Sequence, residues 1–101
     1  MNIKINGVNL IISLKVRHMI QTKFVDKLDQ LLPQFNNELK TATLHIQKDK
    51  RYKNYIAKFD MSLPGLKNSI YAETCHQDLT AAIVDLREAV ERQIKKYKHA
   101  D

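Results

Sequence analysis

The chain has 101 residues, of which 44% are hydrophobic and 28% are charged, with only two Gly and two Pro. These proportions are typical of an ordinary globular protein and argue against a disordered tail or a low-complexity linker. The net charge of +6 favours nucleic acid or another anionic surface as a partner. We therefore expect a single domain over residues 1–101, near the commonest domain size.

Two features indicate the compartment. Cys75 is alone, so no intramolecular disulfide can form, and nothing points to an oxidising environment. The first ten residues contain no apolar core of signal-peptide length, and no stretch approaches the roughly 20 apolar residues of a membrane span. The sequence predicts a cytoplasmic protein without a membrane partner.

The first elements in the chain are a strand and a helix. Ile3 and Ile5 alternate with polar residues, which predicts a strand with one buried face that Gly7 ends. Ser13 fits the N-cap of a helix, and Pro33 would stop that helix near residue 32. The apolar stripe of this helix recurs at spacings of four and three and consists of Val16, Ile20, Phe24, Leu28 and Leu31.

Three further strands and a second helix follow. Residues 42–48 and 55–63 alternate apolar and polar side chains on either side of a polar run. A turn at residues 64–68 precedes a short strand with Ile70, Ala72 and Thr74 on one face. Asp78 fits the N-cap of the last helix. The buried stripe expected on that helix consists of Leu79, Ile83, Leu86, Val90, Ile94 and Tyr97.

The order of these elements predicts the α+β class with the topology β-α-β-β-β-α. Short connections make the last three strands an antiparallel meander, and the first strand should join in parallel through a right-handed crossover. Each strand has one apolar face, so both helices should pack on the same face of the four-stranded sheet. The expected architecture is a two-layer sandwich whose other sheet face is exposed to water.

Catalysis has little support in the sequence. The four histidines are scattered, and no cluster has metal-ligand spacing: His18, His45, His76 and His99. Neighbours on a strand point to opposite faces, so Cys75 and His76 do not form a working pair, and Cys75 reads as an incidental residue at a strand end. Acidic residues are expected on solvent faces: Asp26, Asp29, Asp85, Glu88 and Glu91. No enzyme activity, metal, cofactor or small-molecule substrate is expected.

Positive charge gathers in three segments of the chain. Residues 87–98 have two acids against five cations: Arg87, Arg92, Lys95, Lys96 and Lys98. Residues 40–58 have one acid against six cations: Lys40, Lys48, Lys50, Arg51, Lys53 and Lys58. The first helix adds Lys15, Arg17, Lys23 and Lys27. Two helices side by side should pool their exposed cations along the groove between them.

Each basic segment also has an explanation without a ligand. Cations in a last helical turn gain about 0.3–1 kcal/mol from the helix dipole, and lysines on a hairpin protect a sheet edge. Tyr52 can stack on a base or only brace its turn. Taken together, the segments favour a nucleic-acid backbone, and no motif for reading base sequence is present. On charge alone, Lys50, Arg51 and Lys53 are additional candidate contacts with such a backbone.

The segment "FDMSLPGLKNSIYAETCHQDLTAAIVDLREAVERQIKKYK" resembles the ribosome hibernation-promoting and ribosome-associated inhibitor proteins. The Ala81-Ala82-Ile83 and Arg92-Gln93-Ile94 runs are the most specific parts of the likeness. The opening "INGVNLIISLKVRHMIQTKF" resembles the first strand and helix of that family. The resemblance covers nearly the whole chain in the right order.

The resemblance implies a fold similar to double-stranded-RNA-binding domains and a place at the decoding region of the small ribosomal subunit. Such proteins use basic helix surfaces against ribosomal RNA and keep ribosomes inactive in stationary phase or stress. The residues carried over from the family as rRNA contacts are Arg17, Lys23, Arg92, Gln93, Lys96 and Lys98. Charge and position add Lys27, Arg87 and Lys95. Val84 and Ala89 depart from the family pattern, and Arg87 can substitute for the Lys that Ala89 replaces.

The length of the chain resembles that of the short hibernation-promoting form, which in the family acts with a separate ribosome modulation factor. The expected partners are therefore the small subunit, the whole ribosome and such a factor. Two alternatives stay open. One is a general double-stranded-RNA-binding module, and the other is a protein-interaction module that modulates a sigma factor, as older descriptions of the family suggest.

Overall fold

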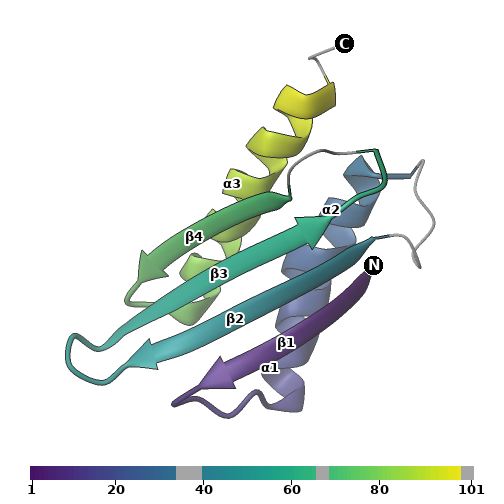
Figure 1. The fold of residues 1–101 in the computed structure, drawn as a ribbon. Coiled ribbons are helices and arrows are strands. Elements are labelled where there is room, and N and C mark those ends of the chain that lie inside the picture. The colour runs from purple at the N-terminus through teal and green to yellow at the C-terminus, as the bar shows by residue number, and fades with distance from the viewer. Residues whose placement is uncertain (34–39, 66–68, 99–101) are drawn as a thin grey trace.

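The computed structural model describes residues 1–33, 40–65 and 69–98, and for residues 97 and 98 only the backbone. The elements follow the predicted order, with one difference in the first helix (Figure 1). They are β1 (Asn2–Val8), α1 (Leu14–Ile20), a π-helical segment η1 (Gln21–Val25), α2 (Asp26–Leu31), β2 (Thr41–Asp49), β3 (Asn54–Ser62), β4 (Ile70–His76) and α3 (Leu79–Lys98).

The four strands form one sheet in the order β1-β2-β3-β4. β1 runs parallel to β2, and the other two pairings are antiparallel, as the connection lengths predicted. The α1–η1–α2 unit and α3 both lie on one face of the sheet and leave the other face open (Figure 1). The predicted α+β two-layer architecture is confirmed.

The first helix differs from its prediction, because one π-helical turn interrupts it. It begins as expected at Ser13, whose Oγ accepts a hydrogen bond from the Val16 amide at 3.2 Å. After α1 the backbone widens into the π segment and then returns to the α form in α2. Leu32 ends the helix with φ −127°, directly before Pro33.

The apolar stripe explains this π turn. Val16, Ile20, Phe24 and Leu28 are spaced by four residues three times in succession. An α-helix of 3.6 residues per turn would rotate the stripe by about 40° at each step, so Leu28 would leave the core. A π turn takes up the extra residue, and Ile20, Phe24 and Leu28 are all fully buried.

The core lies between the sheet and the helices. Ala42, Leu44 and Ile46 of β2 face inward, as do Ala57, Phe59 and Met61 of β3. The rings of Phe24 and Phe59 meet edge to face, with their centroids 4.9 Å apart and an interplanar angle of 68°. This contact joins the π segment to the centre of the sheet.

Gly7 has a different role from the predicted one. β1 continues through it to Val8, so Gly7 does not end the strand. A Cβ atom at this position would lie 2.5 Å from the Leu10 carbonyl oxygen and 3.0 Å from the Ile12 side chain. The loop after β1 can fold back on the strand only because residue 7 has no side chain.

α3 is capped as predicted, because Asp78 Oδ1 accepts a hydrogen bond from the Thr80 amide at 3.3 Å. Its inward stripe is also confirmed as far as Ile94, since Ile83, Leu86 and Val90 are fully buried and Leu79 is half-buried. The predicted burial of Tyr97 lies outside the described residues. The Pro-Gly turn predicted after β3 agrees with a φ of +86° at Gly65.

Candidate RNA-binding surfaces

Exposed cations line the helical layer, and we call this set the helix surface. Its members are Lys15, Arg17, Lys23, Lys27, Arg92, Lys95 and Lys96. The described part of the helical elements exposes three carboxylates against these seven cations, namely Asp26, Asp85 and Glu88. The layer that faces away from the sheet therefore has a clear positive excess, as phosphate binding requires.

Arg87, expected to contact RNA, is half-buried between the helices. Its Nη1 donates a hydrogen bond to the Lys23 carbonyl oxygen at 3.0 Å, and its Nε lies 3.1 Å from Glu91 Oε1. Lys23 belongs to the π segment, so this hydrogen bond ties α3 to the irregular part of the first helix. Arg87 thus joins α3 to the π segment, and part of its charge is neutralised by Glu91.

Gln93 lies on the other flank of α3. Its Nε2 donates a hydrogen bond to the Tyr71 carbonyl oxygen of the edge strand β4. At about 100° per residue, Lys96 lies opposite Arg87 around the helix, and Arg92 lies about 140° from it. Arg92 therefore lies nearly opposite the buried stripe of α3, on the side away from the sheet, and Lys96 lies between that side and the β4 flank. The expectation that all cations pool in the groove between the helices is wrong for these two residues.

The remaining predicted helix contacts are placed as follows. Arg17 lies in α1, Lys23 in the π segment and Lys27 in α2, and all three are exposed. Lys95 is exposed near the end of α3. The side chain of Lys98 lies outside the described residues.

Lys40 does not belong to the basic surface, although the sequence grouped it there. Only 3% of its side chain is exposed, and its Nζ lies 2.8 Å from Asp29 Oδ1. Asp29, expected on a solvent face, is only 27% exposed and also lies near the amino group of Met1. This ion pair connects α2 to the start of β2, so its role is structural.

We predict that Lys40→Met, which keeps the aliphatic stem but removes the charge, will destabilise the fold by about 1–2 kcal/mol. The loss stays moderate because Asp29 keeps some access to water. Urea unfolding measures it, with Lys50→Met as the matched control at an exposed lysine. Equal unfolding midpoints for the two variants would show that the pair contributes nothing.

A second group of cations lies on the hairpin between β2 and β3. Residues 48–53, which we call the hairpin tip, carry four exposed cations against one carboxylate. The cations are Lys48, Lys50, Arg51 and Lys53. Lys48 and Tyr55 are cross-strand partners, and Lys48 Nζ lies 5.7 Å from the centre of the Tyr55 ring. Sequence reasoning missed this pair because it depends on the register of the hairpin.

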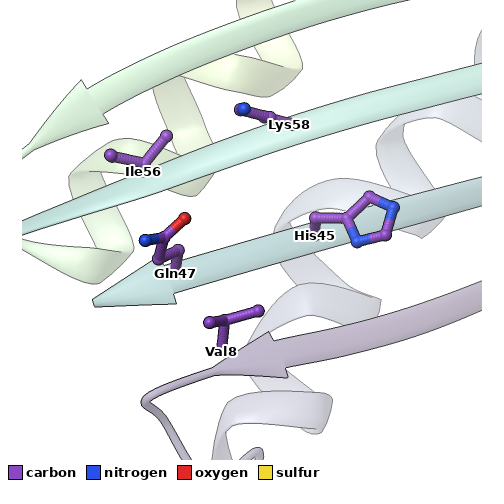
Figure 2. A pocket seen from close by; sticks show the side chains of 5 residues that line it. All are labelled: Val8, His45, Gln47, Ile56 and Lys58. Atoms are coloured by element: carbon purple, nitrogen blue, oxygen red, sulfur yellow. The ribbon is translucent and has the colours of Figure 1, made fainter. Parts of the chain in front are cut away.

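The open sheet face differs in character from both basic surfaces. Cross-strand neighbours His45 and Lys58 separate two shallow grooves, of about 320 and 250 Å³. Figure 2 shows the larger groove, where these residues lie with Val8, Gln47 and Ile56. The charges on this face balance, because two exposed lysines are matched by two exposed carboxylates. The lysines are Lys4 and Lys58, and the carboxylates are those of Asp60 and Glu73. This balance disfavours a polyanion as its ligand.

Tyr71 borders the smaller groove, and its hydroxyl donates a hydrogen bond to Glu73 Oε2 at 3.2 Å. Desolvation raises the pKa of Tyr71, and so do this hydrogen bond and the negative charges of Glu73 and Asp60. The phenol therefore stays neutral at physiological pH and adds no charge to the sheet face.

The described residues contain no group of three or more His, Cys, Asp or Glu side chains that could hold a metal ion. Cys75 is exposed at the end of β4, where the sequence placed it. Its neighbour His76 accepts a hydrogen bond from the Asp78 amide at 3.2 Å. Within the same part of the chain, no helix is long and apolar enough to cross a membrane.

A small α+β sheet with a basic helical layer defines the class as a candidate RNA-binding domain. A family model described as "Sigma 54 modulation protein / S30EA ribosomal protein" matches residues 3–100. The chain belongs to this family, in agreement with the resemblance seen in the sequence.

One curated relative, the "Ribosome hibernation promotion factor" of Staphylococcus aureus (strain COL), is 35% identical over 96 residues. The match covers 94% of the present chain but 47% of the relative, so the chain spans about half the length of that protein.

Two solved structures share the fold. The Protein Y N-terminal domain of Thermus thermophilus superposes with a TM-score of 0.78 at 28% identity, covering 96% of this chain and 99% of that one. A ribosomal subunit interface protein of Coxiella burnetii superposes with a TM-score of 0.72 at 21% identity, covering 97% and 98%. At that identity the second likeness supports the fold alone.

Proposed function

We propose that this chain is a ribosome hibernation factor, which binds the small ribosomal subunit at the decoding region and inhibits translation in stationary phase or stress. Residues 1–101 act as one ribosome-binding domain in the cytoplasm. The partner is ribosomal RNA, in the small subunit alone or in the whole ribosome. The protein works by occupying a site, without catalysis, cofactor or membrane.

The observation that supports this proposal best is the separation of charge between the two layers. Among the described side chains, the helical layer exposes the seven cations of the helix surface and three carboxylates, whereas the charges on the open sheet face balance. A chain with positive charge on its helical layer alone, and with 35% identity to a hibernation promotion factor, is suited to bind phosphates through its helices. Such contacts position a protein on RNA without reading base sequence.

Within this proposal, the rRNA contacts divide into two groups. The direct contacts are Arg17, Lys23, Lys27, Arg92, Lys95, Lys96 and Lys98. Arg87 and Gln93 already have protein partners in Lys23 and Tyr71, so any contact they make with RNA comes in addition to holding α3 in place. A ribosome modulation factor remains a candidate protein partner.

Co-sedimentation through a sucrose gradient tests the proposal directly. Purified protein is mixed with small subunits, large subunits or whole ribosomes at two salt concentrations. We expect stoichiometric binding to small subunits and whole ribosomes but not to large subunits. Binding should weaken with salt, with log affinity falling by about 0.7–0.9 per neutralised phosphate for each unit of log salt.

Other results would favour other functions. Protein left at the top of the gradient at physiological salt would contradict the hibernation proposal. Equal binding to any long duplex RNA would indicate a general double-stranded-RNA binder. The family description includes modulation of sigma 54. A protein partner of that kind would bind with a weaker dependence on salt than a phosphate backbone does.

A further inference from the structure

The hairpin tip is held in shape without help from the Tyr52 ring. Asp49 Oδ1 accepts a hydrogen bond from the Arg51 amide at 2.9 Å. Lys53 adopts a left-handed backbone conformation with φ 54° and turns the chain into β3. Tyr52 is 64% exposed. The sequence left open whether Tyr52 braces the turn, and this exposure shows that its ring is not packed into it.

One face of the Tyr52 ring already has a partner. The Arg51 guanidinium carbon lies 5.7 Å from the ring centre, which is within the range of a cation–π contact. Such a contact occupies one side of the ring and favours one orientation for it. The high exposure of Tyr52 leaves the other side of the ring open to solvent. A flat, exposed ring backed by a guanidinium is a surface on which a nucleobase can stack.

The charge around this ring suits the phosphates on either side of such a base. Lys50 and Lys53 flank the Arg51-Tyr52 pair in the sequence, and both are exposed. The carboxylate at the tip, Asp49, accepts from the Arg51 amide, so one of its oxygens is directed into the turn. The open sheet face has balanced charge, whereas the tip has a strong positive excess.

The tip also lies far from the basic end of α3. β2 and β4 finish at the same end of the sheet, since Tyr55 pairs with both Lys48 and His76. α3 starts beside that end and runs toward the opposite one, so the hairpin and the α3 C-terminus lie at opposite ends of the molecule (Figure 1). The longest dimension of the protein is 43 Å. The tip can therefore reach RNA that the end of α3 does not.

We infer that the hairpin tip binds an unpaired RNA nucleobase, which stacks on the free face of Tyr52 while Lys50 and Lys53 contact the flanking phosphates. The base must be unpaired, because a base inside a duplex has both faces covered by its neighbours. The identity of the RNA as ribosomal rests on the proposed function. The stacking and charge contacts of the tip do not depend on the proposed function, and they apply to any accessible single-stranded RNA.

Short RNA probes separate stacking from charge. The full chain is titrated with a single-stranded hexaadenylate and with an abasic hexamer that has the same phosphates. Tyr52→Ala should weaken hexaadenylate binding by about tenfold, the effect of losing one stacked base, and leave abasic binding unchanged. Tyr52→Phe keeps a ring and should bind both probes like the wild type. The double variant Lys50→Ala, Lys53→Ala should weaken the binding of both probes by the same factor.

Three results would overturn the inference. Tyr52→Ala could bind hexaadenylate as tightly as the wild type does, or it could lose affinity for both probes equally. Tyr52→Phe could fail to bind hexaadenylate like the wild type. Circular dichroism of each variant shows whether the fold is intact; at an exposed tip residue we expect no change.

Small subunits give a readout that separates this inference from the proposed function. In chemical probing, the wild type should protect one unpaired base that Tyr52→Ala leaves reactive, while protections due to the helices persist in both. If the wild type binds subunits and no protection depends on Tyr52, the tip inference fails and the proposed function stands. If the wild type does not bind subunits but hexaadenylate binding depends on Tyr52, the proposed function fails and the tip inference stands.

Discussion

Reversing two charges on α3, with Arg92→Glu and Lys96→Glu together, should weaken binding to small ribosomal subunits by at least about a hundredfold. Both side chains are exposed on the part of the helix that faces away from the interhelical groove. Each replacement removes a charge-assisted contact of about 1.5–3 kcal/mol and presents a carboxylate to the phosphates. The slope of log affinity against log salt should also fall by about 0.7–0.9 for each lost phosphate contact.

The matched control reverses Lys4 and Lys58 on the open sheet face, which changes the net charge by the same amount. Both lysines are exposed, and that face has balanced charge. We expect this control to lose no more than about threefold in affinity, because salt screens charges more than about 10 Å from the RNA. Equal losses in the two double variants would mean that net charge, and not the helix surface, governs binding.

This comparison also tests how α3 is oriented on its RNA. Arg87 and Gln93 fix the rotation of α3, one through the π segment and the other through the edge of the sheet. Arg92 and Lys96 therefore face away from the groove between the helices. If they contact phosphates, the RNA must extend over the outer side of α3 and cannot be confined to the interhelical groove.

Most of the architecture could be predicted from local patterns. Alternation in the segments of β2 and β3 fixed which residues face the core, and the short connections fixed the antiparallel pairing. The π turn was missed, although its signal is present in the sequence. Three successive spacings of four between Val16 and Leu28 fit 4.0 residues per turn better than 3.6. Reading the stripe only as amphipathic hid this difference.

The candidate site was harder to predict, because it depends on contacts between distant residues. Lys40 looks like any other lysine of a basic run, and only the tertiary fold brings it to Asp29. Arg87 likewise meets the Lys23 carbonyl across 64 residues of sequence. Composition and charge located the basic segments correctly, but they could not show which cations were already engaged with the protein itself.

Phe59→Ala should produce the largest loss of stability, about 3–5 kcal/mol in the free energy of unfolding. The ring is fully buried at the centre of β3, and its removal leaves a cavity in addition to the lost apolar burial. Domains of this size are stable by only about 5–15 kcal/mol, so the variant should be close to unfolding at physiological temperature. Urea unfolding followed by circular dichroism measures the change.

Tyr52→Ala is the control for Phe59→Ala, since it also truncates an aromatic side chain, but at a position that is 64% exposed. It should change stability by no more than about 0.5 kcal/mol. A loss of comparable size in both variants would contradict the assignment of Phe59 to the core and of Tyr52 to the surface.

The same ring also determines how the helices sit on the sheet, because Phe59 meets Phe24 of the π segment edge to face. Phe24→Ala should therefore also lower the free energy of unfolding. The loss in the double variant should be smaller than the sum of the two single losses by about 0.5–1.5 kcal/mol. Strict additivity would mean that the two rings are not coupled. The position of the π segment, and of the Lys23 carbonyl that holds Arg87, would then have to be set by the rest of the core.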